Sequence, residues 1–364
     1  MKKPRPIFPG SPNTPAPELQ NGLPAPPPKS DKKLYIGILL LFVLMLVLIA
    51  AIIVRISSKK VATPVVAVNA SVQKTAASNL PGLQLDSSKD YGNKYANGIL
   101  PVGDSMYVTD GPKAGYVYAC STYAQSLSGG AGGAQARGPW FVSGGTQYDI
   151  NKKLHVAGNV IWQASFSNKV SGTTRTIITN DLPNHPTGVF PISPADPAYA
   201  YDRNPNHIKG QTLTYNLNAA PTYNSTPSCM GGEVGVMLTG VALFSAFDAG
   251  GRDAGAWEVQ DACDGHPQME GEYHYHTLSS CIKDASVHTV IGFALDGFPI
   301  TGPQVGDGNV LTTSDLDECH GLTSSVVLDG KTVTTYHYVM TEDFPYSASC
   351  FRSTPTNPPN QLGH

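Results

Sequence analysis

Apolar residues form one long uninterrupted run near the start of this chain. Residues 34–54 read LYIGILLLFVLMLVLIAAIIV, 21 residues without a charge. As a helix, a run of this length crosses a hydrocarbon core of about 30 Å. It is too long, and its basic lead-in lies too far from the start, for a cleaved signal peptide. The pattern predicts one transmembrane helix over residues 34–56.

The segments beside this run have little periodicity. Residues 1–33 are rich in proline and poor in apolar side chains, which predicts a disordered tail. Residues 57–90 are rich in Ala, Ser, Val and Thr, and predict a flexible stalk. Residues 356–364 are interpreted as a C-terminal tail.

The rest of the chain alternates short apolar runs with turn residues. The runs predict strands at 105–109, 115–120, 154–166, 175–179, 233–244, 287–295 and 331–340. Eight prolines between residues 180 and 227 predict a long irregular segment that packs over the sheet. We therefore expect residues 91–355 to form a mainly β domain, a sandwich or barrel-like fold with long irregular loops.

Charge is distributed unevenly along the sequence. The first 60 residues hold nine lysines and arginines and two acids, which leaves 15 basic and 25 acidic residues for the remainder. An acidic body without a basic cluster repels phosphate backbones, so we expect no nucleic-acid partner. A protein or cell-surface partner remains an open alternative.

The cysteines decide the expected orientation, because lysines and arginines are balanced on the two sides of the apolar run. All six cysteines follow that run, and an even number confined to one side is typical of disulfides in an oxidising compartment. We expect a single-pass protein of the cell membrane, with its N terminus in the cytoplasm and its domain outside. Six cysteines allow 15 pairings, and the simplest joins Cys120 to Cys229, Cys263 to Cys281 and Cys319 to Cys350.

The chemistry of the chain centres on Tyr273-His274-Tyr275-His276. In a strand, successive side chains point to opposite faces, so both imidazoles share one face and both phenols the other. Two imidazoles on one face can bind one metal ion, and zinc or copper suits nitrogen ligands. Further ligands are open, and the candidates are His266, His320, His337 and Asp264.

A weaker copy of this region follows in the sequence. Asp261-Ala-Cys263-Asp-Gly265 precedes the first Tyr-His-Tyr, and Asp317-Glu-Cys319-His-Gly321 precedes a second at 336–338. The second copy has Val339 where the first has His276, and Leu322 where the first has His266. The duplication therefore favours one composite metal site over two equivalent sites.

Several separate motifs together resemble the YHYH-domain family, over residues 175–355. They are Pro183-Asn-His185-Pro-Thr-Gly188, Asn204-Pro-Asn206, Gly251-Arg252-Asp253-Ala254, Cys263-Asp-Gly-His266-Pro, Gly271-Glu-Tyr-His-Tyr-His276, Leu295-Asp296-Gly297-Phe298 with Gly302-Pro303, Leu316-Asp-Glu-Cys-His-Gly321 and Phe344-Pro-Tyr346 through Cys350. The resemblance implies an exported or membrane-attached β-rich module without an established activity.

Three functions are compatible with these observations. The first is binding of copper or zinc at His274 and His276 for sequestration, sensing or structural closure. The second is an exported metal-dependent hydrolase or oxidase, which would need an open coordination position and a general base such as Asp264 or Asp296. The third is an adhesion module in which the histidines are structural and exposed tyrosines contact a partner.

Overall fold

The computed structural model describes residue 45 and residues 80–123 and 134–359. The chain divides into two units, residues 1–75 and 76–364, and the fold described below belongs to the second. The predicted transmembrane run lies outside the described residues except for Met45, as do the proline-rich tail and most of the predicted stalk. Among the residues that are described, no helix has both the length and the apolar character to cross a membrane.

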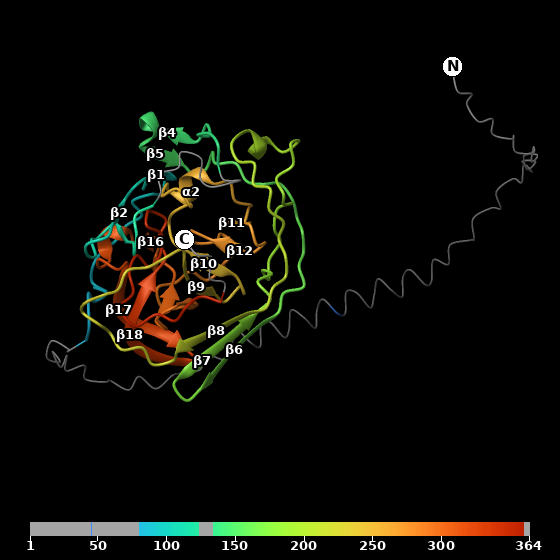
Figure 1. The fold of residues 1–364 in the computed structure, drawn as a ribbon. Coiled ribbons are helices and arrows are strands. Elements are labelled where there is room, and N and C mark those ends of the chain that lie inside the picture. Colours follow the sequence, from blue (N-terminus) through green and yellow to red (C-terminus); the bar gives the residue numbers. More distant parts are fainter. Residues whose placement is uncertain (1–44, 46–79, 124–133, 360–364) are drawn as a thin grey trace, which may run out of the picture. The chain divides into compact units, whose positions relative to one another are not determined.

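The centre of the domain is an eight-stranded mixed sheet (Figure 1). Its order is β11-β12-β10-β9-β13-β14-β18-β17. Two neighbouring pairs, β10 with β12 and β14 with β18, are parallel, and the others are antiparallel. The strands are β9 (Glu233–Met237), β10 (Ala242–Phe244), β11 (Gly265–Pro267), β12 (Tyr273–Tyr275), β13 (Val290–Ala294), β14 (Pro299–Thr301), β17 (Gly321–Leu328) and β18 (Lys331–Val339).

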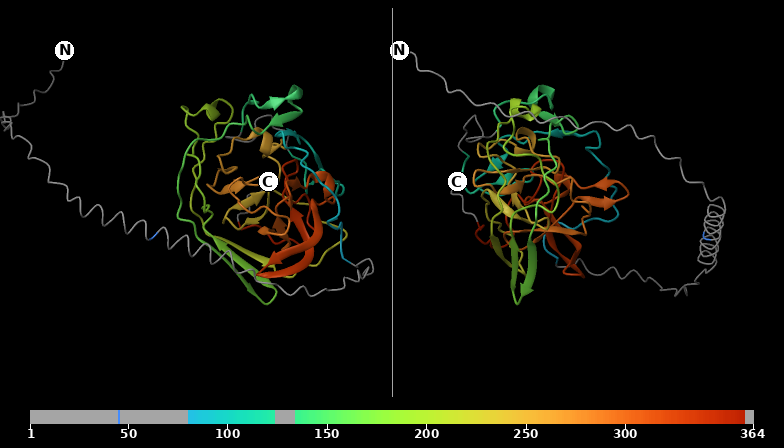
Figure 2. Two further views of the ribbon diagram at one scale, coloured as in Figure 1. Left: turned by 180° about the vertical axis from the view of Figure 1, so that it is seen from behind. Right: turned by 90° about the vertical axis from the view of Figure 1, so that its right-hand side faces the viewer.

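Smaller elements surround this sheet. Three strands at one end, β6 (Phe166–Ser171), β7 (Thr174–Thr179) and β8 (Leu213–Asn218), form a separate sheet that projects at the lower edge in both views of Figure 2. The remaining strands are β1 (Ile99–Pro101), β2 (Tyr107–Val108), β3 (Val117–Tyr118), β4 (Phe141–Val142), β5 (Gln147–Asp149), β15 (Gln304–Gly306) and β16 (Asn309–Val310). The helical turns are α2 (Ala254–Trp257), η1 (Ser143–Gly145), η2 (Pro197–Ala200) and η3 (Thr313–Asp315).

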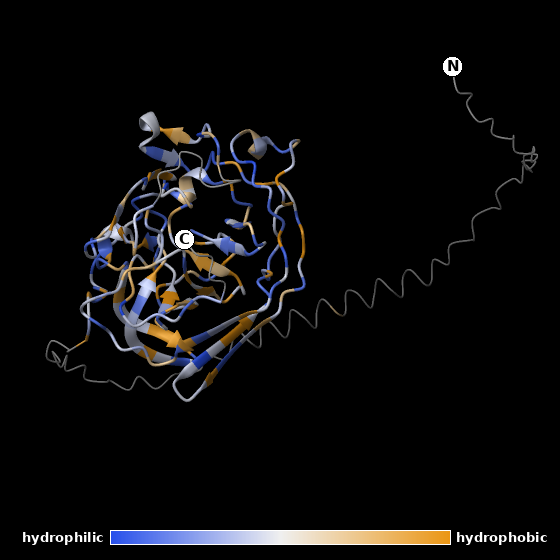
Figure 3. Ribbon diagram, viewed as in Figure 1, coloured by the Kyte–Doolittle hydropathy of each residue, from blue (hydrophilic) through white to orange (hydrophobic). Residues whose placement is uncertain are grey.

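The mainly β prediction is confirmed, and the large sheet is open rather than closed into a barrel. Apolar residues concentrate in its central strands (Figure 3). Most predicted runs contain a strand, but residues 154–165 form only isolated bridges at Val156 and Val160. The end of the predicted stalk pairs with the domain, because Leu85 donates to the carbonyl oxygen of Thr323.

The large sheet consists of two similar halves, which extends the duplication seen in the sequence. One half is β9 to β12, and the other is β13, β14, β17 and β18. Counted inward from the two edges of the sheet, β11 corresponds to β17, β12 to β18, β10 to β14 and β9 to β13. The halves meet where Val236 pairs with Phe293. The hairpin of β9 and β10 is equivalent to the hairpin of β13 and β14. Both have a register shift at the end away from the turn, and both have a glycine with positive φ in the turn, Gly240 at 89° and Gly297 at 92°.

The outer strands repeat the same pairing. His266 is opposite His274 in β11 and β12, and Leu322 is opposite His337 in β17 and β18. The turn before each edge strand, residues 261–265 before β11 and 317–321 before β17, also repeats. Asp264 and His320 occupy equivalent positions in these turns, and both have a positive φ, of 64° and 69°. These pairings define which positions of the two halves are equivalent.

Gly235 and Gly292 are equivalent positions where the two halves cross, and both are expected to reject a side chain. A Cβ at Gly235 would lie 2.5 Å from the carbonyl oxygen of Phe293, and one at Gly292 would lie 2.7 Å from Sδ of Met237. Gly235→Ala and Gly292→Ala should each lower the free energy of unfolding by about 1–3 kcal/mol, the usual cost of overpacking. Urea unfolding measures this. Gly231→Ala is the control, because its Cβ would meet nothing within 4 Å, and an equal loss there would contradict the assignment.

Candidate metal centre

Three histidines of the first half lie together beneath the surface. His274 lies in β12 and His276 directly follows that strand, and the antiparallel pairing of β11 with β12 adds His266 opposite His274. One ring nitrogen from each lies within 4.8 Å of the others. Each of the three residues is at most 4% exposed. The tyrosines point to the other face, where Tyr273 and Tyr275 pack edge to face at 5.8 Å, as the alternation predicts.

Backbone carbonyls fix the tautomers of two of these rings. Nδ1 of His274 lies 3.2 Å from the carbonyl oxygen of Glu272, and Nδ1 of His276 lies 2.5 Å from that of Ser245. A carbonyl oxygen only accepts, so each Nδ1 must carry the hydrogen. Each Nε2 therefore presents a lone pair, and the two Nε2 atoms face each other at 3.1 Å. Two facing lone pairs repel unless a cation lies between them.

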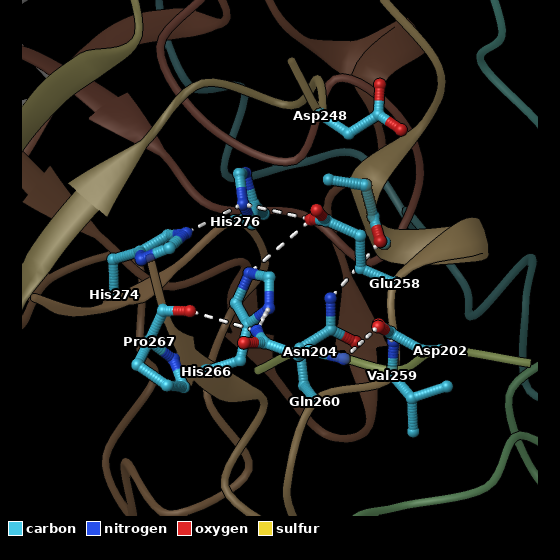
Figure 4. A network of polar contacts seen from close by, with 12 residues as sticks. Asp202, Asn204, Asp248, Glu258, Val259, Gln260, His266, Pro267, His274 and His276 are labelled. Carbon is cyan, nitrogen blue, oxygen red and sulfur yellow. Dashed lines mark hydrogen bonds and ion pairs between the residues drawn. The ribbon is translucent and has the colours of Figure 1, made fainter. Parts of the chain in front are cut away.

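The Glu258 carboxyl group completes the cluster (Figure 4). Its Oε2 lies 3.3 Å from Nε2 of His276 and 3.4 Å from Nε2 of His266. Within the described residues, neither Oε2 of Glu258 nor Nε2 of His266 has a hydrogen-bond partner. Metal bonds of about 2.0 Å in a tetrahedral site separate neighbouring ligand atoms by about 3.3 Å. Three of the six separations that such a site has are 3.1, 3.3 and 3.4 Å, which is close to this value. The ligand atoms that all lie within 4.8 Å of one another are those of the three histidines, without Glu258.

Glu258 is held in place by the short helix α2. Asp253 caps this helix by accepting from Ala256 N, and it also accepts from Gly103 N and the Tyr346 hydroxyl. The backbone N–H of Glu258 closes the helical turn by donating to Ala254. The capped turn thus directs the Glu258 side chain at the imidazoles.

Burial controls the charge of the cluster. It lowers the pKa of His276 to about 4 and the pKa values of His266 and His274 well below the usual range, where the neighbouring imidazoles lower them further. Burial also raises the pKa of Glu258 well above its usual range, with contributions from Asp248 and Asp202. Neutral imidazole is the form that binds metals.

Two further contacts orient the rings. Phe244 stacks on His274 with ring centroids 4.1 Å apart. The amide nitrogen of Asn204 donates to the carbonyl oxygen of Pro267 at 2.9 Å and lies 3.4 Å from Nδ1 of His266. Metal binding at Nε2 of His266 would break this second contact, because a neutral ring then carries its hydrogen on Nδ1. Nearby, Arg252 forms an ion pair with Asp248 at 2.6 Å.

The other ligand candidates lie outside this cluster. His337 in β18 contacts the hydroxyls of Thr301 at 2.9 Å and Ser324 at 2.8 Å. His320 contacts the hydroxyl of Thr341 at 3.0 Å, and Asp264 accepts from Ser280 N at 2.8 Å. The expected composite of both halves is not what the structure assembles, since the cluster takes all three imidazoles from the first half.

The second half has apolar side chains at two of the positions where the first half has clustered imidazoles. Val339 and Leu322 occupy the positions equivalent to His276 and His266, and they pack into a cluster with Val287, Leu311 and Leu316. Asp296, the other candidate base, accepts from the Tyr338 hydroxyl at 2.7 Å and is fully buried. Val339, Leu322 and the Asp296 carboxylate are therefore all part of the core of the second half.

Three disulfides close the fold with the simplest predicted pairing. They join Cys120 to Cys229, Cys263 to Cys281 and Cys319 to Cys350. The second encloses all three histidines of the cluster, and the third is its equivalent in the other half. No cysteine of the described chain is free.

Glu258 is not among the candidate site residues that the sequence indicates. It lies eight residues before His266, in a short segment that also holds Asp248, Asp253 and Asp261. The feature of the sequence that could have indicated a helical turn just before Glu258 is the run Gly251-Arg-Asp253-Ala, in which Asp253 caps α2. Spacing alone could not show that this turn folds against the imidazoles.

Residues 214–310 match the family model described as YHYH protein. This confirms the family resemblance over a stretch from β8 to β16 that includes the three clustered histidines, Glu258 and all four strands of the first half. The second Tyr-His-Tyr lies beyond the matched region. No curated protein and no solved structure matches the chain.

Proposed function

We propose that this chain binds one transition-metal ion, zinc or copper, through His266, His274, His276 and Glu258. The observation that carries the proposal is the pair of Nε2 lone pairs that face each other at 3.1 Å, each fixed by a carbonyl on Nδ1. A bound cation turns this repulsion into attraction. It would also bind Oε2 of Glu258 and Nε2 of His266, which make no hydrogen bond within the described chain and contact only each other and Nε2 of His276.

The nature of the ligands favours these metals. Three imidazoles and one carboxylate form the mixed nitrogen and oxygen set that zinc binds tetrahedrally, and copper also binds imidazole well. The four residues are at most 8% exposed, so an ion there would be enclosed. Enclosure with four protein ligands is typical of a structural or storage site, whereas a catalytic zinc site keeps an open position. The proposed roles are therefore structural closure, sequestration or sensing.

The proposed location is the outer face of the cell membrane. The uncharged run at residues 34–54 would anchor the chain. Three disulfides support an oxidising compartment for the domain. The domain with the metal site would then lie in a compartment where it can take up extracytoplasmic zinc or copper.

Metal titration tests the proposal. The full-length chain, purified with a histidine-free tag and stripped with a chelator, should bind one equivalent of Zn²⁺ or Cu²⁺ in calorimetry. Binding of neither metal would refute the proposal.

Glu258→Gln should weaken this binding at least about tenfold, because it removes the negative charge from a ligand that supports the imidazoles. Calorimetry of the variant measures the change. Glu270→Gln is the control, since Glu270 is an exposed residue of the loop between β11 and β12. Equal affinity of Glu258→Gln and the parent chain would exclude Glu258 as a ligand.

A further inference from the structure

A second group of potential ligands lies beside the Cys263–Cys281 disulfide. A ring nitrogen of His185 and the two sulfur atoms all lie within 4.8 Å of one another. Nδ1 of His185 donates to the carbonyl oxygen of Pro186 at 2.9 Å, so Nε2 carries the lone pair. This nitrogen accepts from the Tyr275 hydroxyl. The group is distinct from the histidine cluster and shares no residue with it.

The two cysteines would stay close together without the sulfur–sulfur bond. The Ser279 hydroxyl donates to the carbonyl oxygen of Cys263 at 2.6 Å. Ser280 N donates to Asp264 at 2.8 Å, and the Ser280 hydroxyl donates to the carbonyl oxygen of Ala262 at 2.8 Å. These three hydrogen bonds hold the segment of Cys281 against the segment of Cys263. Reduction would therefore leave two thiols near each other.

His185 is anchored to the same framework. The Asp261 carboxylate accepts from Gly188 N, three residues after His185, and from Cys263 N, both at 2.9 Å. On the other side, Asn184 N donates to the carbonyl oxygen of Thr239. The Asp261 carboxylate thus connects the segment of His185 to the segment of Cys263 by hydrogen bonds. His185 and the two cysteines would therefore already be close together before a metal ion binds.

The three disulfides differ in access and in their neighbours. Cys281 is half-buried, whereas Cys319 and Cys350 of the equivalent disulfide are both 0% exposed. Cys120 is exposed, but no metal-binding group of the described residues includes it. The Cys263–Cys281 pair alone combines access for a reductant with an adjacent imidazole, as far as the described residues extend.

We propose that reduction of the Cys263–Cys281 disulfide opens a second metal site, made of two thiolates and His185. A dithiol reductant would supply two electrons and two protons, converting the disulfide to two thiols while it becomes a disulfide itself. Binding of a soft ion, Cu(I) or Zn²⁺, then releases the two thiol protons. The Tyr275 hydroxyl, displaced from Nε2 of His185, keeps its contact with Thr239 at 3.2 Å.

Thiolates select such ions, so the site would respond to both redox state and metal supply. The proposal does not depend on the histidine cluster. Metal at that cluster should bind in both redox states, whereas this site should bind only after reduction.

The experiment uses the full-length chain carrying His274→Ala and His276→Ala, with and without reduction by a phosphine. Co²⁺ is the probe, because thiolate ligation gives an intense near-ultraviolet charge-transfer band that imidazole and carboxylate do not. The reduced protein is expected to bind one more equivalent of Co²⁺ than the oxidised protein and to show this band. Adding Cys263→Ser with Cys281→Ser should abolish both, and His185→Ala should weaken binding at least tenfold.

Cys120→Ser with Cys229→Ser is the matched control, since it removes an accessible disulfide without an adjacent histidine and should leave the added equivalent intact. If the Cys263 and Cys281 variant fails to fold, His185→Ala decides alone. The proposal is overturned if reduction adds no equivalent, or if the added equivalent survives His185→Ala at unchanged affinity.

Discussion

Replacing both His274 and His276 by alanine is expected to abolish metal binding, reducing the content from one ion per chain to none. The two Nε2 atoms lie 3.1 Å apart and provide two of the four proposed ligands. Their loss leaves His266 and Glu258, a pair too weak to compete with buffer or chelator. Elemental analysis of both proteins after identical loading measures the difference.

Stability gives a second measure of the same change. A ligand at a hundred times its Kd stabilises a protein by about 2.7 kcal/mol, so saturating zinc or copper should raise the melting temperature of the parent chain. The double variant should show no such rise. Its metal-free stability should also fall, because the substitutions leave space in the interior.

The chain provides a matched control for these variants. His337 is the equivalent of His274 in the second half, is fully buried, and contacts two hydroxyls. His337→Ala should lower stability but leave metal content unchanged. Equal metal content in the double variant and the parent would exclude the proposed ligands.

Asp261→Ala is expected to cause the largest loss of folding stability, at least about 3 kcal/mol. The Asp261 carboxylate is fully buried and accepts from four groups: Gly188 N, Cys263 N, Gly265 N and the Tyr273 hydroxyl. Alanine leaves these donors unsatisfied in the interior, and each buried donor without a partner costs about 1–3 kcal/mol. Denaturant unfolding of the metal-free chains measures the loss.

The second half predicts a parallel result. Asp317 accepts from Cys319 N, Gly321 N and the Tyr336 hydroxyl, and it also pairs with Arg352 at 2.8 Å. Asp317→Ala should therefore destabilise the chain to a similar extent, while Asp110→Ala, at an exposed residue, should change little. If Asp261→Ala and Asp317→Ala both lowered the free energy of unfolding by less than about 1 kcal/mol, the structural role of these two carboxylates would be contradicted.

Local sequence pattern predicted the parts of the site that lie on one hairpin. Strand alternation places His274 and His276 on one face, and the repeat of Asp-x-Cys-x-Gly before each Tyr-His-Tyr predicts the two halves. The disulfides follow because each of the last two pairs closes a short segment. These features depend on residues close in sequence, where geometry is constrained by the backbone.

Features that depend on distant contacts were not accessible in the same way. The approach of Glu258 to His276 depends on how a one-turn helix packs, and periodicity carries no signal for so short an element. The second Tyr-His-Tyr suggested that His337 and His320 would join the site. The structure instead gives them hydroxyl partners, because the outer strands of the two halves lie at opposite edges of one sheet.

The duplication explains why one site is expected rather than two. Val339 and Leu322 replace the imidazoles of the second half by aliphatic side chains, and these form part of a buried apolar cluster. Thr301, equivalent to Phe244, supplies a hydroxyl to His337. The second half thus keeps the architecture and lacks the ligands.

Anomalous scattering at the zinc and copper edges, measured on crystals of the metal-loaded chain, tests the central claim most directly. We expect a single peak bonded to Nε2 of His274 and of His276, with Nε2 of His266 and Oε2 of Glu258 as the further ligands. Absence of a peak between His274 and His276, or a second peak of equal occupancy in the other half of the sheet, would contradict the account.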